Sequence, residues 1–281
     1  MSEIDLAEFA VIGGSSTFSL HFPEDVEAED VQVLKSGVRF DTPYGPGPEM
    51  KLFTLGDKRV WTVKMHGWRP EEGLPRGQAS QRLFWILGQA GVRKVYAEGG
   101  VGACNHLLDL RDVVIPDDYI DQSMRKDVGL GGPYLLVMRQ PTCPHGRRRL
   151  ARAARDAGLG RVFERGVYAN TDGRHFESVA EVRALQMMGA DVIGQSMCPE
   201  VYLAREIGAC YARVDLVVNY AEGVVRDWRH EELRDLFFQE ARAVGRILLD
   251  ALRETPLDED CGCRDLRKDT LLTKENIGKG R

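Results

Sequence analysis

Short apolar segments of the chain alternate with stretches in which apolar residues recur every three or four positions. The apolar segments are 9–14, 59–65, 93–100, 112–117 and 212–220, and they predict strands. The helical spacing occurs at 78–89, 147–157, 178–188, 199–207 and 230–253. Alternation of this kind is typical of a mostly parallel sheet with helices on its faces. We therefore predict an α/β fold.

The longest helical pattern runs from His230 to Arg253. Its apolar residues lie on one broad face, so we predict one continuous amphipathic helix. Ser178 and Glu181 form a capping box, which predicts the start of the helix at 178–188. Two segments, 41–50 and 67–77, are dense in proline and glycine and are predicted to be long loops. Loops on an α/β scaffold often carry the functional site.

The chain is long enough to bury one large core. It has 281 residues, of which 43% are hydrophobic, and this length is near the upper end for one α/β domain. From about residue 257 the chain is mostly charged. We predict a single domain over 1–256, with a mostly parallel, twisted, mixed sheet covered by helices. A polar C-terminal tail over 257–281 is expected to be peripheral or mobile.

Charge and hydropathy exclude some classes of partner. The formal net charge is −5, and no segment is rich in lysine and arginine, so nucleic acid is excluded as a partner. The first residues carry acids and too short an apolar run for a secretory signal. No stretch approaches the ~20 apolar residues of a membrane span. We expect a cytoplasmic protein.

The six cysteines are too sparse for a disulfide scaffold and fit reduced thiols. Cys261 and Cys263 form a close pair, but no second pair of cysteines or histidines follows at metal-binding spacing. An inert tail is therefore favoured over a zinc or redox site, and we predict no metal. Without a glycine-rich dinucleotide fingerprint, we also expect no nicotinamide or flavin cofactor.

Two segments have the residues of an anion site. The first is Gly13-Gly14 followed by Ser15, Ser16 and Thr17, because glycine lets backbone N–H groups approach an anion and hydroxyls add donors. A tight turn that ends a buried strand explains the same residues. The second segment is 194–201, where polar residues precede a helix whose free N–H groups suit an anion.

Polar residues also follow two strands. Lys64, His66 and Trp68 place a cation, an imidazole and a large aromatic ring at the end of strand 59–65. His66 alone is more often structural. Asn219 ends the strand 212–220, where a side-chain amide offers a donor and an acceptor to the edge of a heterocycle.

The types and order of these motifs resemble the trimeric purine nucleoside phosphorylases and methylthioadenosine phosphorylases over about residues 9–253. IGGSS at 12–16 resembles the N-terminal phosphate loop, and DTPYG at 41–45 resembles the DTPFG segment of the methylthioadenosine branch. FESVAE at 176–181, GAD at 189–191 and CPEV at 198–201 are similar to the series FETVAE, GAD and VPEV. The ordered set is more specific than any single motif.

The resemblance implies that phosphate attacks the anomeric carbon of a purine nucleoside, with the protein supplying position and charge stabilisation. The implied phosphate ligands are Ser15, Lys64, His66, the backbone N–H of Gly100, and Ser196. Met65 stands where the methylthioadenosine branch has arginine, and Gly99 stands where the family usually has threonine or asparagine.

The same mapping implies ligands for the base and the sugar. The base would contact Phe176, Glu177 and Asn219, and the sugar would contact Trp68, Gln195 and His230. For His230 a plain helix start is an equal alternative. Asparagine at 219 resembles the enzymes for 6-oxopurines, whereas the adenine branch has aspartate there. Asn219, His66 and Ser196 are the implied catalytic residues.

Three functions remain open. The first is phosphorolysis, with phosphate as co-substrate and no cofactor. The second is a nucleoside hydrolase or other divergent glycosyl-transferring enzyme, with Glu98 as general base. The third is a catalytically poor nucleoside-binding protein, because fold does not determine function. The resemblance also implies a homotrimer, in which Leu135 stands where a neighbouring subunit usually donates a histidine.

Overall fold

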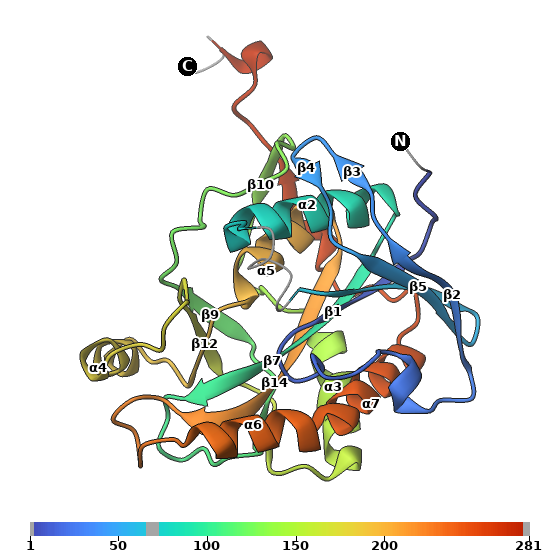
Figure 1. The fold of residues 1–281 in the computed structure, drawn as a ribbon. Helices are drawn as coiled ribbons and strands as arrows, with labels where there is room; N and C mark the ends of the chain where they lie inside the picture. Colours follow the sequence, from blue (N-terminus) through green and yellow to red (C-terminus); the bar gives the residue numbers. More distant parts are fainter. Residues whose placement is uncertain (1–2, 66–72, 278–281) are drawn as a thin grey trace.

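The computed structural model describes residues 3–65 and 73–277 (Figure 1). Its centre is a sheet of eleven strands. They are β1 (Phe9–Gly13), β2 (Val31–Val38), β5 (Met50–Leu55), β6 (Lys58–Lys64), β7 (Lys94–Ala103), β8 (Val113–Val114), β9 (Asp118–Asp121), β11 (Val162–Phe163), β12 (Val167–Asn170), β13 (Val192–Gly194) and β14 (Cys210–Tyr220). Eight follow the order β11-β8-β14-β7-β1-β6-β5-β2, and β13, β12 and β9 branch from β7.

The middle of the sheet is parallel and its margins are partly antiparallel. β6, β1, β7 and β14 run parallel to one another, whereas β5 pairs antiparallel with β2 and β6. β13 and β8 pair antiparallel with β7 and β14. The predicted class, a mostly parallel mixed sheet in an α/β domain, is confirmed.

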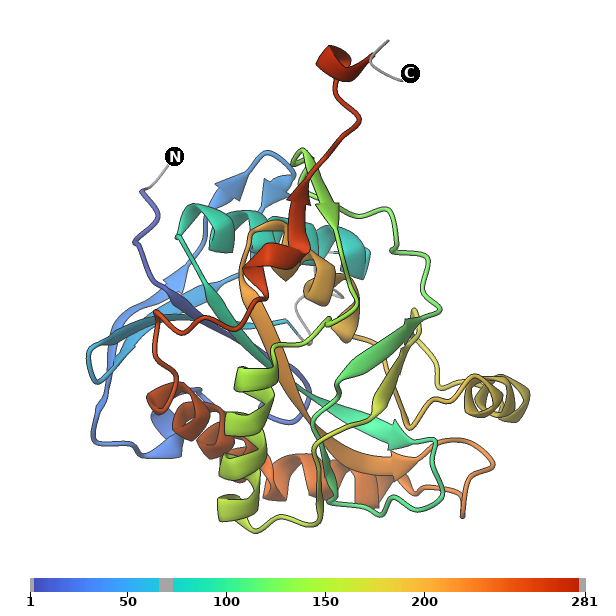
Figure 2. The ribbon, with the colours of Figure 1, turned by 180° about the vertical axis from the view of Figure 1, so that it is seen from behind.

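Helices cover both faces of this sheet. α2 (Arg76–Gln89) and α5 (Met197–Glu206) lie on one face, and α3 (Pro144–Ala157) and α7 (Ala241–Arg253) lie on the other (Figures 1 and 2). α4 (Val179–Met187) lies at the periphery, and α6 (His230–Gln239) packs against β14. None of the described helices is long and apolar enough to cross a membrane.

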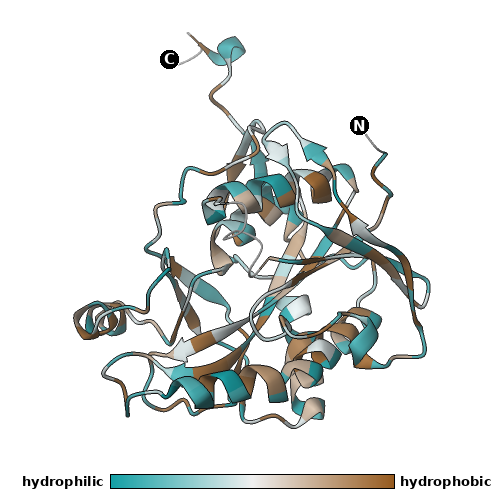
Figure 3. Cartoon of the chain, viewed as in Figure 1, coloured by the Kyte–Doolittle hydropathy of each residue, from teal (hydrophilic) through white to brown (hydrophobic). Residues whose placement is uncertain are grey.

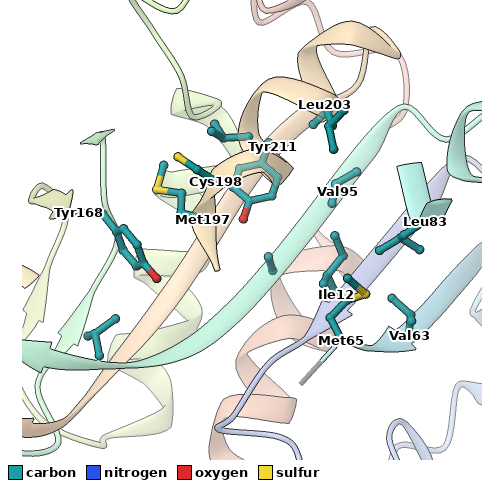
Figure 4. Packing of buried hydrophobic residues seen from close by; sticks show 14 of the residues in the cluster. Ile12, Val63, Met65, Leu83, Val95, Tyr168, Met197, Cys198, Leu203 and Tyr211 are labelled. Atoms are coloured by element: carbon teal, nitrogen blue, oxygen red, sulfur yellow. The ribbon is translucent and has the colours of Figure 1, made fainter. Parts of the chain in front are cut away.

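Each face of the sheet has its own apolar core, because successive side chains of a strand point to opposite faces. In β1, Ala10 and Ile12 join the core beneath α2 and α5, while Phe9 and Val11 join the core beneath α3 and α7. Figure 4 shows Ile12 in the first core. Figure 3 shows the central strands largely apolar and the outer sides of the helices largely hydrophilic.

The predicted continuous helix from 230 to 253 is wrong, because α6 ends at Gln239 and α7 begins at Ala241. Between them Glu240 is nearly buried, and its Oε1 pairs with Nε of Arg111 at 2.7 Å. α6 packs on β14 and α7 packs on α3. The apolar periodicity continues across the break because both helices bury an apolar face, α6 against β14 and α7 against α3.

Segment 41–50, predicted to be a long loop, contains regular structure. β3 (Asp41–Thr42) and β4 (Gly45–Pro46) form a small hairpin, and Thr42 Oγ1 donates to the Gly45 carbonyl at 2.7 Å. Most of the second predicted loop lies outside the described residues. The capping box that begins α4 is confirmed, because Ser178 and Glu181 exchange their side-chain and backbone hydrogen bonds.

Part of the C-terminal segment packs on the domain. β15 (Arg267–Asp269) pairs antiparallel with β10 (Tyr134–Leu136). Cys263 is 3% exposed. The segment from 257 is therefore attached to the domain at two places, although the boundary at 256 stays a prediction.

Candidate active site

A cavity of about 440 Å³ opens at the carboxyl ends of β1, β7, β13 and β14, beside α6. This is the edge at which α/β sheets usually bind ligands. Most of the predicted site residues that the structure describes line it: Ser15, Glu98, Gly100, Phe176, Glu177, Gln195, Ser196 and Asn219. The sequence motifs, far apart along the chain, thus meet in one place.

The glycine-rich end of β7 forms the floor of the cavity. A Cβ built on Gly99 would lie 3.7 Å from Ser196 Oγ, and one on Gly100 would lie 3.0 Å from Ser15 Oγ. A Cβ on Gly102 would lie 3.3 Å from Asn219 Nδ2. The predicted phosphate residues and the predicted base residue therefore follow one another along a single strand.

Three predicted phosphate ligands lie together at one end of the cavity. The N–H of Gly100 donates to Ser15 Oγ at 2.8 Å. Ser196 is the N-cap of α5, makes no side-chain cap of its own, and lines the cavity. His66 and Trp68 lie outside the described residues, and their predicted roles stay predictions.

Lys64 does not line the cavity, which departs from its predicted role as a phosphate ligand. Its Nζ donates to the Phe18 carbonyl at 3.0 Å and lies over the Phe18 ring. Met65 is buried and lines the cavity instead. Lys64 ends β6 and Met65 follows it directly. Because successive side chains of an extended chain point to opposite sides, only one of the two faces the cavity, and that one is apolar.

Glu98 is held by the glycine loop that follows β1. Its carboxylate accepts hydrogen bonds from the N–H groups of Gly14, Ser16 and Thr17 and from Thr17 Oγ1. Burial raises the pKa of Glu98, and hydrogen bonding from Thr17, Gly14 and Ser16 acts in the opposite direction. The loop that the sequence indicated as an anion cradle is thus occupied by a side chain of the protein.

At the end predicted to bind the base, Asn219 is 5% exposed and its Nδ2 donates to the Tyr220 carbonyl at 2.9 Å. An irregularity in the β7–β14 register lies just before it, so that Asn219 pairs with Gly102. Glu177 accepts a hydrogen bond from Thr171 Oγ1 at 2.6 Å. Phe176 is 46% exposed and meets the Trp228 ring edge-on. These groups offer a stacking surface and polar partners for a planar ligand.

The two described sugar candidates lie differently. Gln195 lines the cavity, and its Nε2 donates to the His175 carbonyl at 3.1 Å. His230 is exposed at the first residue of α6 and does not line the cavity. Leu233 and Phe237, on later turns of the same helix, do line it. The sugar role of His230 is therefore not supported by this arrangement.

Sequence reasoning missed an ion pair directly beneath the cavity floor. Arg213 and Asp215 on β14 are both fully buried, with Arg213 Nη2 2.5 Å from Asp215 Oδ1. Arg213 Nη2 also donates to Ser196 Oγ at 3.2 Å, and its guanidinium stacks on Tyr168. Charged residues at alternate positions of a strongly apolar strand were the available signal.

Further charged groups line the cavity near this pair. Arg76, at the start of α2, is 8% exposed, and Glu200 of α5 is 2% exposed. Glu200 accepts a hydrogen bond from the Tyr211 hydroxyl at 2.9 Å, and burial raises the pKa of Glu200. The end of the cavity that is predicted to bind phosphate therefore lies among buried charges of both signs.

Comparison with known proteins assigns the fold and the family. The family model of the phosphorylase superfamily matches residues 8–253. The chain is 32% identical to the 6-oxopurine nucleoside phosphorylase of Pyrococcus furiosus, with 94% of this chain and 98% of that protein covered. It is 29% identical to the S-methyl-5'-thioadenosine phosphorylase of Pyrococcus abyssi, with 94% of this chain and 98% of that protein covered.

Among solved structures, a methylthioadenosine phosphorylase from an antarctic soil metagenomic library aligns with a TM-score of 0.74 and 24% identity. The alignment covers 89% of this chain and 86% of that one, and it supports the fold. The family match and these similarities lead to one assignment. The chain belongs to the phosphorylase superfamily, among the purine nucleoside and methylthioadenosine phosphorylases.

Proposed function

We propose that this protein cleaves the N-glycosidic bond of a 6-oxopurine nucleoside with phosphate, giving the free base and a pentose 1-phosphate. The order of groups along β7 carries the proposal: Ser15 and Ser196 lie beside Gly100 and Gly99, and Asn219 lies beside Gly102. Two strand residues span about 7 Å, which suits a pentose between phosphate and base.

At the phosphate end, the Ser15 and Ser196 hydroxyls donate to the anion. The N–H of Gly100, which donates to Ser15 Oγ in this structure, turns to a phosphate oxygen when the anion binds. Arg213 holds the Ser196 oxygen from below. These donors place one phosphate oxygen for attack on the anomeric carbon, which is mainly catalysis by positioning.

At the base end, the bonding pair of the glycosidic bond moves onto the purine as the bond breaks. The resulting negative charge spreads to the ring nitrogens and to the 6-oxo group. The second N–H of Asn219 Nδ2 donates to this charge, and its Oδ1 accepts from a protonated ring nitrogen. A carboxylate at this position would offer no donor to a carbonyl. Asparagine at 219 therefore favours a 6-oxopurine. The name of the relative from P. furiosus agrees with this preference.

A hydrolase would require a general base that activates water, and Glu98 was the candidate. Its carboxylate already accepts four hydrogen bonds from the loop 14–17. A general base must be within reach of the proton that it removes and must have an oxygen available to accept it. The hydrogen bonding of Glu98 therefore supports phosphate over water as the nucleophile.

The test is turnover of inosine, guanosine, adenosine, methylthioadenosine and methylthioinosine, with and without phosphate, followed by chromatography of base and sugar products. We expect release of hypoxanthine and guanine that requires phosphate and yields a sugar 1-phosphate. Ser196→Ala should raise KM for phosphate about tenfold or more. Ser36→Ala, an exposed serine on the edge strand β2, is the matched control. Free sugar formed without phosphate contradicts the proposal.

We also propose a homotrimer located in the cytoplasm, with phosphate as co-substrate and no other cofactor at the active site. Leu135 on β10 is 57% exposed, which is suitable for a subunit contact at the position implied by the family resemblance. Light scattering coupled to size-exclusion chromatography tests the oligomer. A monomer at micromolar concentration contradicts this part of the proposal.

A further inference from the structure

Four of the six cysteines lie together, far from the active site. They are Cys143, Cys210, Cys261 and Cys263, and their sulfur atoms all lie within 4.8 Å of one another. Cys143 is the N-cap of α3, Cys210 begins β14, and the other two belong to the C-terminal segment. Spacing along the chain showed no partners for the pair at 261 and 263, and the fold supplies them.

We propose that these four cysteines bind a structural Zn²⁺ ion as thiolates. Zn–S bonds of about 2.3 Å place the sulfur atoms of a tetrahedron about 3.8 Å apart. The sulfur atoms of Cys210 and Cys261 are 3.2 Å apart, and the others lie within the 4.8 Å limit. A closed set of four sulfur ligands selects zinc among the common cellular metals, with iron as the main competitor.

The backbone holds the ligands in place without the metal. Cys143 N–H donates to the Tyr211 carbonyl at 2.7 Å, and Cys210 N–H donates to the Arg93 carbonyl at 2.9 Å. Between the other two ligands, Gly262 has φ +68°, a left-handed conformation that favours glycine and turns the chain sharply. Its N–H donates to Asp260 Oδ1 at 3.0 Å.

Two buried cations lie beside the cluster, which argues for thiolates over a pair of disulfides. Zinc with four thiolates has a net charge of about −2, whereas disulfides are neutral. Lys94 is 6% exposed, pairs with Cys210 in the β7–β14 register, and lies with Nζ 3.7 Å from Cys210 Sγ. Arg205 is 3% exposed and donates to the Cys263 carbonyl at 2.6 Å. A buried ammonium requires a negative partner, and a thiolate provides one.

The cluster is suited to a structural role. Cys143 and Cys263 are buried, while Cys210 and Cys261 are partly exposed along a shallow hollow of about 240 Å³ that gives the metal a path of entry. Cys210 and Asn219 stand at opposite ends of β14, nine residues or about 30 Å apart. Zinc here would anchor the C-terminal segment to β14 and α3, just before β15 pairs with β10.

The first test is metal analysis of the full-length protein, purified without chelators or immobilised metal and measured by plasma mass spectrometry. We expect about one zinc per chain, bound with release of thiol protons. The mass of the denatured, unreduced chain should correspond to six free thiols. The proposal would be overturned by the absence of metal or by iron in place of zinc. It would also be overturned by a mass that is lower by two hydrogens for each disulfide among these cysteines.

Variants test the site independently of activity. Cys261→Ser with Cys263→Ser should abolish zinc binding and speed tryptic cleavage of the C-terminal segment. Cys104→Ser, a buried cysteine outside the cluster, should retain zinc. Lys94→Met should lower zinc affinity about 10- to 100-fold in competition with a chelator. Lys126→Met, at an exposed lysine, should leave the affinity unchanged. Equal affinities in the two lysine variants would overturn the thiolate assignment of Cys210.

Discussion

A Cβ atom built on Gly99 would lie 2.6 Å from Nη2 of Arg213 and 3.0 Å from Asp215 Oδ1. The buried guanidinium thus occupies the space that a side chain at position 99 would need. Gly99 departs from the threonine or asparagine that the family resemblance implies there. The close approach of Arg213 gives the physical reason for glycine.

We predict that Gly99→Ala destabilises the protein by about 1 to 3 kcal/mol, because Arg213 is fully buried and stacked on Tyr168 and has no space to move. Urea unfolding measures the cost. In an Arg213→Ala background the same substitution should cost clearly less, because the clash is gone. Additive costs in this double-mutant cycle would contradict the explanation.

Arg213→Met should cost about 3 to 5 kcal/mol, since it leaves the Asp215 carboxylate buried without its cation. Adding Asp215→Leu should recover most of the stability. The folded double variant should still show a raised KM for phosphate, because Ser196 Oγ has lost its donor. A KM for phosphate equal to that of the native protein would show that Arg213 does not position Ser196.

Asn219→Asp should reverse the preference between oxo and amino purines. We expect kcat/KM for inosine to fall about a hundredfold, or roughly 3 kcal/mol, because the carboxylate no longer donates to the base. The ratio of adenosine to inosine turnover should rise. Asn276→Asp in the exposed C-terminal segment is the control. Parallel losses on both nucleosides would indicate a role in folding rather than in base selection.

Glu98→Gln should destabilise the loop 14–17 and weaken phosphate binding. The carboxamide keeps one acceptor oxygen and directs an NH₂ group at backbone donors, so we expect a loss of about 2 to 3 kcal/mol. Thermal unfolding and KM for phosphate measure the two effects. The exposed Glu29→Gln is the matched control. If Glu98→Gln is as stable as the native protein, the hydrogen bonds from loop 14–17 to Glu98 do not stabilise the fold.

The Asp5–Lys35 pair predicts a small pH-dependent contribution to stability. The hydrogen bond from Lys35, 2.5 Å from Asp5 Oδ2, lowers the pKa of Asp5 below its ordinary value of 3.8. Asp5 therefore stabilises the fold above pH 3.8, and this contribution is lost as the pH falls through the lowered pKa. Asp5→Asn should cost less than about 1 kcal/mol at pH 7, because the pair is solvent-screened. Urea unfolding at several pH values measures this loss of stability, which should become smaller at acid pH. A loss that does not change with pH contradicts the pairing.

Local features of the chain were predictable because their causes are local. The capping box at Ser178 depends on residues three positions apart, and the strands around Phe9 and Asn219 follow from short apolar runs. The part of the site on β1, β7 and β14 could be located because these motifs lie toward the carboxyl ends of parallel strands. Parallel strands bring those ends to one edge whatever their separation in sequence.

The remaining features depend on contacts that no local pattern contains. The break at Glu240 follows from packing on two different surfaces, and the direction of Lys64 follows from which face of β6 meets the cavity. The charges of Arg213 and Asp215 compensate each other in an ion pair that the fold buries completely.

The amino-acid sequence by itself therefore determined the fold class, the family and the edge of the sheet that carries the site. The tertiary structure alone decided which side chains face the cavity, and it gathered Cys143 and Cys210 with the pair at 261 and 263. The physical reason is the range of the interactions. Strands, helices and caps form between near neighbours, whereas burial, charge compensation and ligand clusters depend on residues far apart in the chain.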